Sequence, residues 1–159
     1  MHCSIARSLE RVGEWWSILI LRDALFGLRR FDEFEQSLGI APNMLTRRLK
    51  GLVEGGLLER RPYQERPRRY EYVPTEAGED FRPVLWSLMA WGNRHFAPEG
   101  PSIIVEDTRT GEAAEPVLID RKSGDVLAPP LFRPAAGPAA TERTRQRYER
   151  LRGRTEASP

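Results

Sequence analysis

The chain has 159 residues, of which 40% are hydrophobic and 30% are charged. These values are ordinary for a water-soluble globular protein, and the length suits one compact domain plus an appended segment. No apolar run approaches the roughly 20 residues that span a bilayer, and the first residues do not resemble a secretory leader. The single cysteine excludes an internal disulfide framework and suits a reducing compartment, so we expect a cytoplasmic protein.

Positive charge is concentrated in one part of the chain. The formal net charge is only +2, but residues 41–70 contain eight basic side chains against three acidic ones. Such a stretch is typical of a phosphate-binding face. A solvated charged surface would have the same composition, so the pattern of helices and strands has to decide between them.

Three helices are predicted before residue 40. Ser4 can cap the first, over residues 4–12, and a buried helix follows at about residues 14–25. Apolar side chains at i, i+3 and i+7 predict a third, amphipathic helix over residues 31–38.

A fourth helix, over residues 43–54, has one apolar face and one basic face. Leu45, Leu49 and Leu52 lie within about 40° of one another, because each residue advances about 100° around a helix. The opposite face carries polar and charged side chains, namely Asn43, Arg47, Lys50 and Glu54, and Thr46 lies at its edge. Two short helices joined by a glycine-containing turn predict a helix-turn-helix.

A basic hairpin is predicted directly after this helix. Residues 57–61 and 69–73 have the pattern of two strands, with a turn over residues 63–68. The turn carries arginines on both sides of a proline. A helix-turn-helix followed by such a hairpin, or wing, predicts a winged helix that reads base edges with the helix and contacts phosphates with the wing.

The next part of the chain predicts a long apolar helix that begins after Thr75. Its aromatic and aliphatic side chains exceed what one small domain can cover, so a second copy of the chain is the economical explanation. Residues 102–106 and 117–120 resemble two short strands with glycine turns at Gly111 and Gly124. Residues 128–140 are rich in Pro and Ala and are expected to be loose.

The expected fold is therefore mostly α with a small β-hairpin wing, in the α+β class. Residues 1–97 would form the winged-helix and dimerisation domain, residues 98–127 a small β extension and residues 128–159 a Pro/Ala-rich and basic tail. Residues 141–152 could form a basic helix or a solvated tail, and we favour the tail. No internal repeat is expected.

The chain resembles the HxlR-type winged-helix regulators, which are relatives of the MarR group. The resemblance extends from Cys3 to about Phe96 and rests on several motifs in register, together with Gly13, Trp16, Trp91 and Gly92. These motifs are CSIAR (3–7), ILILR (18–22), RRFDEF (29–34), IAPNMLTRRL (40–49), GLLER (56–60), PRRYEY (67–72) and TEAG (75–78). The resemblance implies a homodimer, built from the first and last helices of this core, that binds a pseudo-palindromic operator.

Two positions depart from the family pattern: Trp15 stands where a polar residue is usual, and Pro74 replaces a more usual leucine. Residues 102–127 also resemble an extension in which cysteines often flank the two glycine turns. Here those positions hold Thr110 and residues 121–123, so neither a metal nor a disulfide is expected there.

The candidate DNA contacts fall into three groups. Asn43, Thr46, Arg47 and Lys50 are predicted to face a major groove, with Arg47 suited to guanine. Arg48 lies nearer the leucine face and could pack or touch the DNA backbone. The remaining candidates for phosphate or minor-groove contact are Arg66, Arg68, Arg69 and, more weakly, Arg30.

Other kinds of site are less well supported by the residues. In some relatives a cysteine at the position of Cys3 senses oxidants or electrophiles through a thiolate near a helix N-terminus, although a lone cysteine is more often inert. His2 and His95 have no partners at ligand spacing, so no metal site is expected, and no cofactor or catalytic motif is present. The tryptophans could line a pocket for a small effector at a dimer interface, with core packing as the alternative.

These features predict a homodimeric regulator, a repressor or an activator, whose two reading helices occupy successive major grooves about 34 Å apart. The alternative is a protein-interaction module that uses the winged-helix fold without binding DNA.

Overall fold

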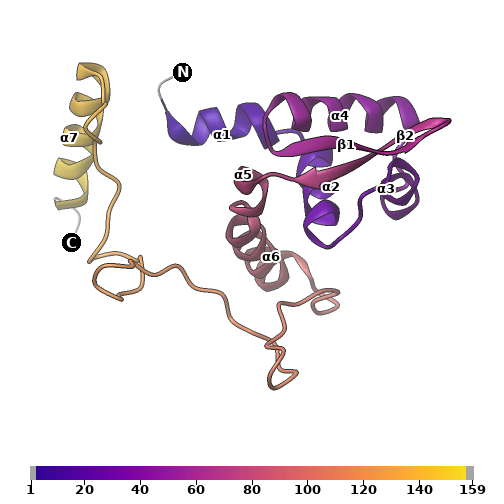
Figure 1. Cartoon of the computed structure of the whole chain (residues 1–159). Coiled ribbons are helices and arrows are strands. Elements are labelled where there is room, and N and C mark those ends of the chain that lie inside the picture. The colour runs from indigo at the N-terminus through magenta and orange to yellow at the C-terminus, as the bar shows by residue number, and fades with distance from the viewer. Residues whose placement is uncertain (1–2, 157–159) are drawn as a thin grey trace. The chain divides into compact units, whose positions relative to one another are not determined.

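The computed structural model describes residues 3–156, and Figure 1 shows the order of its elements. The contacts divide the chain after Pro116, so residues 5–116 and residues 117–156 are described separately. None of the described helices is long and apolar enough to cross a membrane. The elements are α1 (Ser4–Val12), α2 (Trp15–Leu25), α3 (Phe31–Leu38), α4 (Pro42–Glu54), β1 (Leu58–Glu65), β2 (Arg68–Pro74), α5 (Glu76–Glu79), α6 (Arg82–Phe96) and α7 (Glu142–Glu156).

Helix α2 lies at the centre of the hydrophobic core. Its Ile20, Leu21 and Ala24 side chains are completely buried. Phe34 of α3 and the leucine face of α4 pack into the same cluster, and Leu58 adds the base of the hairpin. In Figure 1, α2, α3 and α4 are gathered beside the two strands. This core holds α4 by its apolar face and leaves the other face in solvent.

The turn between α3 and α4 depends on two residues with special backbones. Gly39 ends α3 in the left-handed region, at φ 59°, which glycine adopts without a steric penalty. Pro42 then begins α4, where its missing N–H costs nothing because the first helical N–H groups have no partner inside the helix. The helices predicted over residues 4–12, 14–25, 31–38 and 43–54 are confirmed to within one residue at each end.

The hairpin is longer than expected, because pairing continues almost to its tip. Antiparallel pairs extend from Leu58 opposite Pro74 to Glu65 opposite Arg68, with one irregularity at Tyr63. A third segment joins this sheet at the turn before α3. The Tyr72 N–H donates to the Arg29 carbonyl over 2.7 Å, and Arg30 forms a single bridge with Glu71. The wing is therefore connected along one flank to the α2–α3 turn.

The single long helix expected after Thr75 is wrong, because the structure has two helices there. Thr75 does act as the predicted cap, since its Oγ1 accepts a hydrogen bond of 3.1 Å from the Gly78 N–H. The short α5 ends after Glu79, and α6 begins with Arg82-Pro83. Pro83 has no N–H to continue the hydrogen bonds of a preceding helix, so it is tolerated only in a first turn.

The strands expected over residues 102–106 and 117–120 are also wrong. Each segment contributes only one isolated bridge, Glu106 with Ala113 and Ile119 with Val126. One further backbone hydrogen bond accompanies each bridge, from the Ala114 N–H to the Val105 carbonyl over 2.7 Å and from the Leu127 N–H to the Leu118 carbonyl over 2.9 Å, but no regular strand forms. The glycine turns themselves are confirmed, with Gly111 at φ 76° and Gly124 at φ 80°.

The two turns repeat the same hydrogen bonds thirteen residues apart, so the expectation of no internal repeat is wrong. Gly111 N–H donates to the Asp107 carbonyl over 2.8 Å, and Gly124 N–H donates to the Asp120 carbonyl over the same distance. In both turns the aspartate carboxylate accepts a backbone N–H from within the turn. These bonds lower the pKa of both carboxyls, with the Arg109 guanidinium contributing most at Asp107.

The end of the chain forms a helix and not the expected solvated tail. Helix α7 covers Glu142–Glu156, and Thr141 Oγ1 accepts from the Thr144 N–H at its start. The Pro/Ala-rich residues 128–140 contain turns but neither a helix nor a strand. The division of the chain after Pro116 falls inside the segment expected as an extension. The boundaries at residues 97 and 127 remain predictions.

Candidate nucleic-acid interface

The outer side of α4 presents four polar side chains to solvent. Asn43, Thr46, Arg47 and Lys50 are all exposed, whereas Leu45, Leu49 and Leu52 on the other side are at most 1% exposed. We call these four exposed residues the reading face. The 100° advance per residue and the core beneath α4 together place them on one side.

Two side chains of the reading face are held by hydrogen bonds within α4, and Arg47 is available to bind a ligand. Asn43 Oδ1 accepts from the Met44 N–H over 2.7 Å, and Thr46 Oγ1 donates to the Pro42 carbonyl over 2.8 Å. Lys50 Nζ lies 3.7 Å from Glu54, in a solvent-exposed pair that contributes little. Within the described residues, Arg47 forms no ion pair. Its guanidinium is therefore available to a ligand.

Arg48 is turned away from the reading face. Its Nη2 lies 2.8 Å from Glu14 Oε2, just before α2, and its side chain is only 17% exposed. The Arg48 Nε atom is buried and has no partner among the described residues. This ion pair connects α4 to the start of α2, so Arg48 positions α4 in this structure.

The wing carries its arginines beside a tyrosine. The Arg60 guanidinium lies 3.9 Å from the centre of the Tyr70 ring, and that of Arg68 lies 5.5 Å from the same centre. Arg66, Arg68 and Arg69 are all exposed near the tip. Sequence reasoning missed Arg60 and Tyr70, although their positions on two facing strands were a usable signal.

Arg30 lies beside the wing despite its distance in the sequence. Its guanidinium is 4.8 Å from the centre of the Tyr63 ring, and the residue is exposed. Its backbone is held by Glu33, whose Oε2 accepts the N–H groups of both Arg29 and Arg30 over 2.8 Å. These two backbone hydrogen bonds lower the pKa of Glu33, and the nearby arginine charges act in the same direction.

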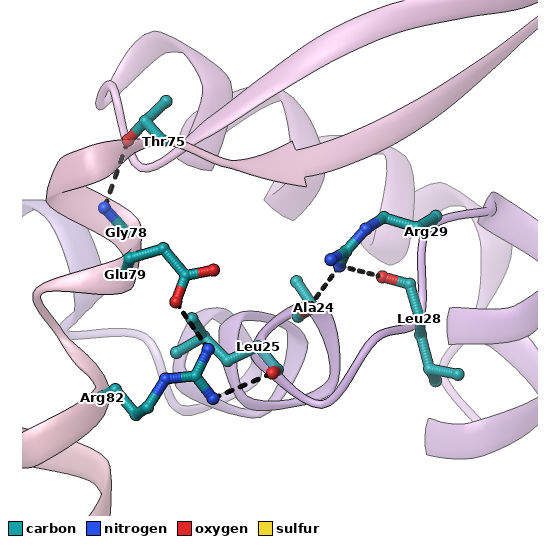
Figure 2. A network of polar contacts seen from close by, with 8 residues as sticks. All are labelled: Ala24, Leu25, Leu28, Arg29, Thr75, Gly78, Glu79 and Arg82. Carbon is teal, nitrogen blue, oxygen red and sulfur yellow. Dashed lines mark hydrogen bonds and ion pairs between the residues drawn. The ribbon is translucent and has the colours of Figure 1, made fainter.

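Two arginines bind backbone carbonyls at the carboxyl end of α2, as Figure 2 shows. Arg29 Nη1 donates to the carbonyls of Ala24 and, over 3.0 Å, Leu28. Arg82 donates to the Leu25 carbonyl over 3.0 Å and pairs with Glu79 over 2.5 Å. The last carbonyls of a helix have no partner inside it and carry partial negative charge, so cations stabilise this end. The Arg82 contacts connect the start of α6 to the end of α2.

Residues 11–100 match the family model described as the HxlR-like helix-turn-helix. The chain belongs to this family. The match covers α2 to α6, and therefore includes the reading face and the wing. It confirms the resemblance that the sequence motifs indicated.

Curated relatives and solved structures agree with this assignment. Rv3095 of Mycobacterium tuberculosis, described as an uncharacterized HTH-type transcriptional regulator, is 44% identical over 136 residues, which are 85% of this chain and 86% of the relative. The structure of PA1374 of Pseudomonas aeruginosa, a proposed transcription factor, is 59% identical and has a TM-score of 0.67. That match covers 91% of this chain and 99% of PA1374. The redox regulator HypR, in its oxidized form, is 29% identical with a TM-score of 0.54, over 58% of this chain and 97% of HypR. This chain is thus an HTH-type transcriptional regulator with a winged-helix fold.

This HxlR-like chain shows no metal site among residues 3–156, where no group of three or more His, Cys, Asp or Glu side chains could hold an ion. His95 lies in an aromatic cluster with Trp91 and Phe96, and His2 lies outside the described residues. Cys3 is exposed and directly precedes the first residue of α1.

The tryptophans of this HxlR-like chain lie largely at its surface. Trp15 is 60% exposed and Trp91 is 54% exposed, whereas Trp16 packs against the hydrophobic core. The effector pocket expected at a dimer interface remains a prediction.

Proposed function

We propose that the chain is a sequence-specific, double-stranded DNA-binding regulator that acts in the cytoplasm as a homodimer on a pseudo-palindromic operator. The observation that carries this proposal is the reading face on a helix whose other side is buried. Arg47 suits the O6 and N7 acceptors of guanine, and Asn43 suits adenine, in a major groove that admits an α-helix. The wing arginines Arg66, Arg68 and Arg69, with Arg30 beside them, would contact phosphates or the adjacent minor groove.

The homodimer is supported by apolar surface that the chain leaves uncovered. On α1, Ile5 is 72% exposed and Leu9 is 56% exposed. On α6, Val84, Trp91 and Phe96 are each more than half exposed. Such residues on two helices are unusual on a monomer and are typical of an interface between copies. The two reading faces of the dimer would then meet successive turns of the same DNA face.

Charge reversal on the reading face tests the DNA contact. The variant Arg47→Glu/Lys50→Glu should abolish the mobility shift of a duplex that the wild-type protein selects from a random pool. The variant Arg121→Glu/Lys122→Glu changes the same charges on an exposed glycine turn and should retain the shift. Retained binding by the first variant would contradict our placement of the site. Failure of the wild type to bind any duplex at low salt would favour the alternative, an interaction module without DNA binding.

The dimer is tested by its mass in solution. Leu9→Glu/Trp91→Glu should sediment as a monomer at concentrations at which the wild type is a dimer, because each substitution places a charge in the proposed apolar contact. A monomeric wild type, or an unchanged dimer in the variant, would contradict the proposed interface.

A redox response through Cys3 is a second, separate proposal. Cys3 is exposed at the beginning of α1, and HypR, with 29% identity to this chain, is named a redox regulator. With no second cysteine in the chain, oxidation would give a disulfide between two copies or an adduct with a small thiol. Diamide should release DNA from the wild type and not from Cys3→Ser. Equal release from both would contradict the role of Cys3.

A further inference from the structure

Helix α7 carries a stripe of exposed arginines along one side. Arg143, Arg147 and Arg150 follow one another at i, i+4 and i+7, and all three are exposed. At 100° per residue they fall within about 60° of one another around the helix. We call these three residues the arginine stripe. It extends about 10 Å along the helix axis, which matches the axial rise of about three nucleotides in one DNA strand.

The acidic residues of α7 lie on a different side, together with two further arginines. Glu142 and Glu149 are about 110–130° from the centre of the stripe, and Arg145 and Arg152 are almost opposite it. Arg145 Nη1 lies 3.9 Å from Glu142 Oε2, and Gln146 donates to the other Glu142 oxygen over 3.0 Å. Glu142 is therefore engaged within the helix, and within the described residues neither Arg143 nor Arg147 forms an ion pair. The Nε of Arg150 donates to the Gln146 carbonyl over 3.2 Å.

The side of α7 that includes Tyr148 faces its own chain. Thr144 and Tyr148 are half-buried, unlike the arginine stripe. Tyr148 and Leu151 line a cavity of about 410 Å³ together with part of the Pro/Ala-rich segment, including Pro134 and Ala135. The stripe does not line this cavity, so the helix is held by one side while its free basic side is open to a ligand.

We propose that the arginine stripe of α7 binds the phosphate backbone of DNA, as a second contact independent of sequence. This inference rests on the proposed function, because it adds to the affinity of DNA that the reading face selects. Three guanidinium groups on one side of a helix suit phosphate oxygens, which each guanidinium can bind bidentately. Attachment to the same chain as α4 raises the effective concentration of the bound duplex for α7.

The composition of α7 favours nucleic acid over a membrane surface. A helix that lies in a membrane interface needs a continuous apolar face, usually rich in Trp, Phe and Leu. Helix α7 offers only Tyr148 and Leu151. A helix that is polar on nearly all sides does not insert among lipids, whereas phosphate contacts with DNA require only exposed positive charge.

The experiment compares two full-length variants that lose the same charge. Arg147→Gln/Arg150→Gln removes two arginines of the stripe, and Arg145→Gln/Arg152→Gln removes two from the opposite side. Glutamine keeps helix propensity close to that of arginine, and circular dichroism verifies that both variants fold. Affinity for a selected duplex with long flanks, and for a scrambled duplex, is measured over a range of salt concentrations.

The stripe variant should have a shallower salt dependence. The slope of log affinity against log salt should decrease by about 0.9 for each lost phosphate contact, hence by about 1.8 per protomer. The ratio of affinities for selected and scrambled DNA should remain as in the wild type. Arg145→Gln/Arg152→Gln should retain the wild-type slope.

Three results would overturn the inference and leave the proposed function standing. The first is an unchanged slope in the stripe variant while Arg47→Glu/Lys50→Glu abolishes binding, which leaves the proposed function intact. The second is an equal loss in the opposite-face variant, which would mean that total charge and not the stripe matters. The third is that the stripe variant loses the binding of wild-type protein to vesicles of anionic phospholipid while its DNA binding is unchanged. If wild-type protein bound no duplex at low salt, both proposals would fail.

Discussion

The Arg82 guanidinium, in the first turn of α6, donates to the backbone carbonyl of Leu25, the last residue of α2, over 3.0 Å. The two residues are far apart in sequence, yet this contact joins the proposed dimer helix to the centre of the core. Glu79 pairs with the same guanidinium over 2.5 Å and fixes its direction. The orientation of α6 therefore depends on a polar contact as well as on apolar packing.

Replacing Arg82 should lower stability by a modest amount. Arg82→Gln removes the ion pair and the helix-terminal hydrogen bond, and we expect a loss of about 1 kcal/mol in the free energy of unfolding, because the side chain is 32% exposed and partly screened. Arg94→Gln, at an exposed position of the same helix, should change it by less than about 0.5 kcal/mol. Urea unfolding of the two variants measures both values. Equal effects would mean that Arg82 contributes only charge.

The Glu33 carboxylate should make stability depend on acidity. Hydrogen bonds from the Arg29 and Arg30 N–H groups lower its pKa below the usual 4.5. A lowered folded-state pKa stabilises the fold above the unfolded-state pKa, and this contribution is lost as the pH falls through the lowered value. Wild type should therefore exceed Glu33→Gln in stability near neutral pH, and the difference should shrink below about pH 4.5. Urea unfolding at a series of pH values measures this difference. A difference that stays constant down to pH 3 would contradict this role.

Gly78 should not tolerate a side chain. A Cβ at this position would lie 2.2 Å from the Leu57 carbonyl oxygen, which already accepts the Thr75 N–H. The backbone cannot give way without losing that bond, so Gly78→Ala should destabilise the protein by about 3 kcal/mol. Gly51, in α4, has open space around the same position, and Gly51→Ala should stabilise it by up to about 1 kcal/mol. Thermal unfolding should show a lower melting temperature for Gly78→Ala and a higher one for Gly51→Ala than for the wild type.

The Tyr70 ring should matter for DNA binding through the two arginines that contact it. Tyr70→Leu removes the ring that both Arg60 and Arg68 contact, so these side chains would have to be ordered by the DNA itself. A cation–π contact at an exposed site is worth about 0.5–1 kcal/mol, which predicts a loss of affinity of about two- to fivefold. Tyr70→Phe keeps the ring and should bind as the wild type does. Fluorescence anisotropy with a labelled duplex measures both, and equal affinities for the Leu and Phe variants would contradict the role of the ring.

Local periodicity predicted the helices before the wing because the information lies within each segment. The leucine spacing of α4 and the Gly39 turn need no knowledge of the rest of the chain. The orientation of Arg48 could not be predicted in this way. Its helical position lies at the edge of the leucine face, and only the approach of Glu14 from the beginning of α2 decides that it turns inward.

The errors after Thr75 have equally specific causes. Pro83 marked a helix boundary, but the continuous apolar pattern around it favoured one long helix. Apolar residues around Ile103 and Leu118 predicted strands, yet strands depend on partners that a local pattern does not reveal. The Pro/Ala-rich segment before α7 suggested a tail, although the arginine-rich residues beyond it have high helix propensity.

The wing is attached at two places: Thr75 Oγ1 donates to the Gly56 carbonyl at the end of α4, and the Tyr72 N–H donates to the Arg29 carbonyl along the flank. On the proposed function, the distance between the groove that α4 enters and the phosphates that the wing reaches is set before the duplex arrives. The spacing between α4 and the wing would then be the same in the free protein and in the complex. Base pairs that it never touches would influence affinity through the ease with which they adopt the required groove width.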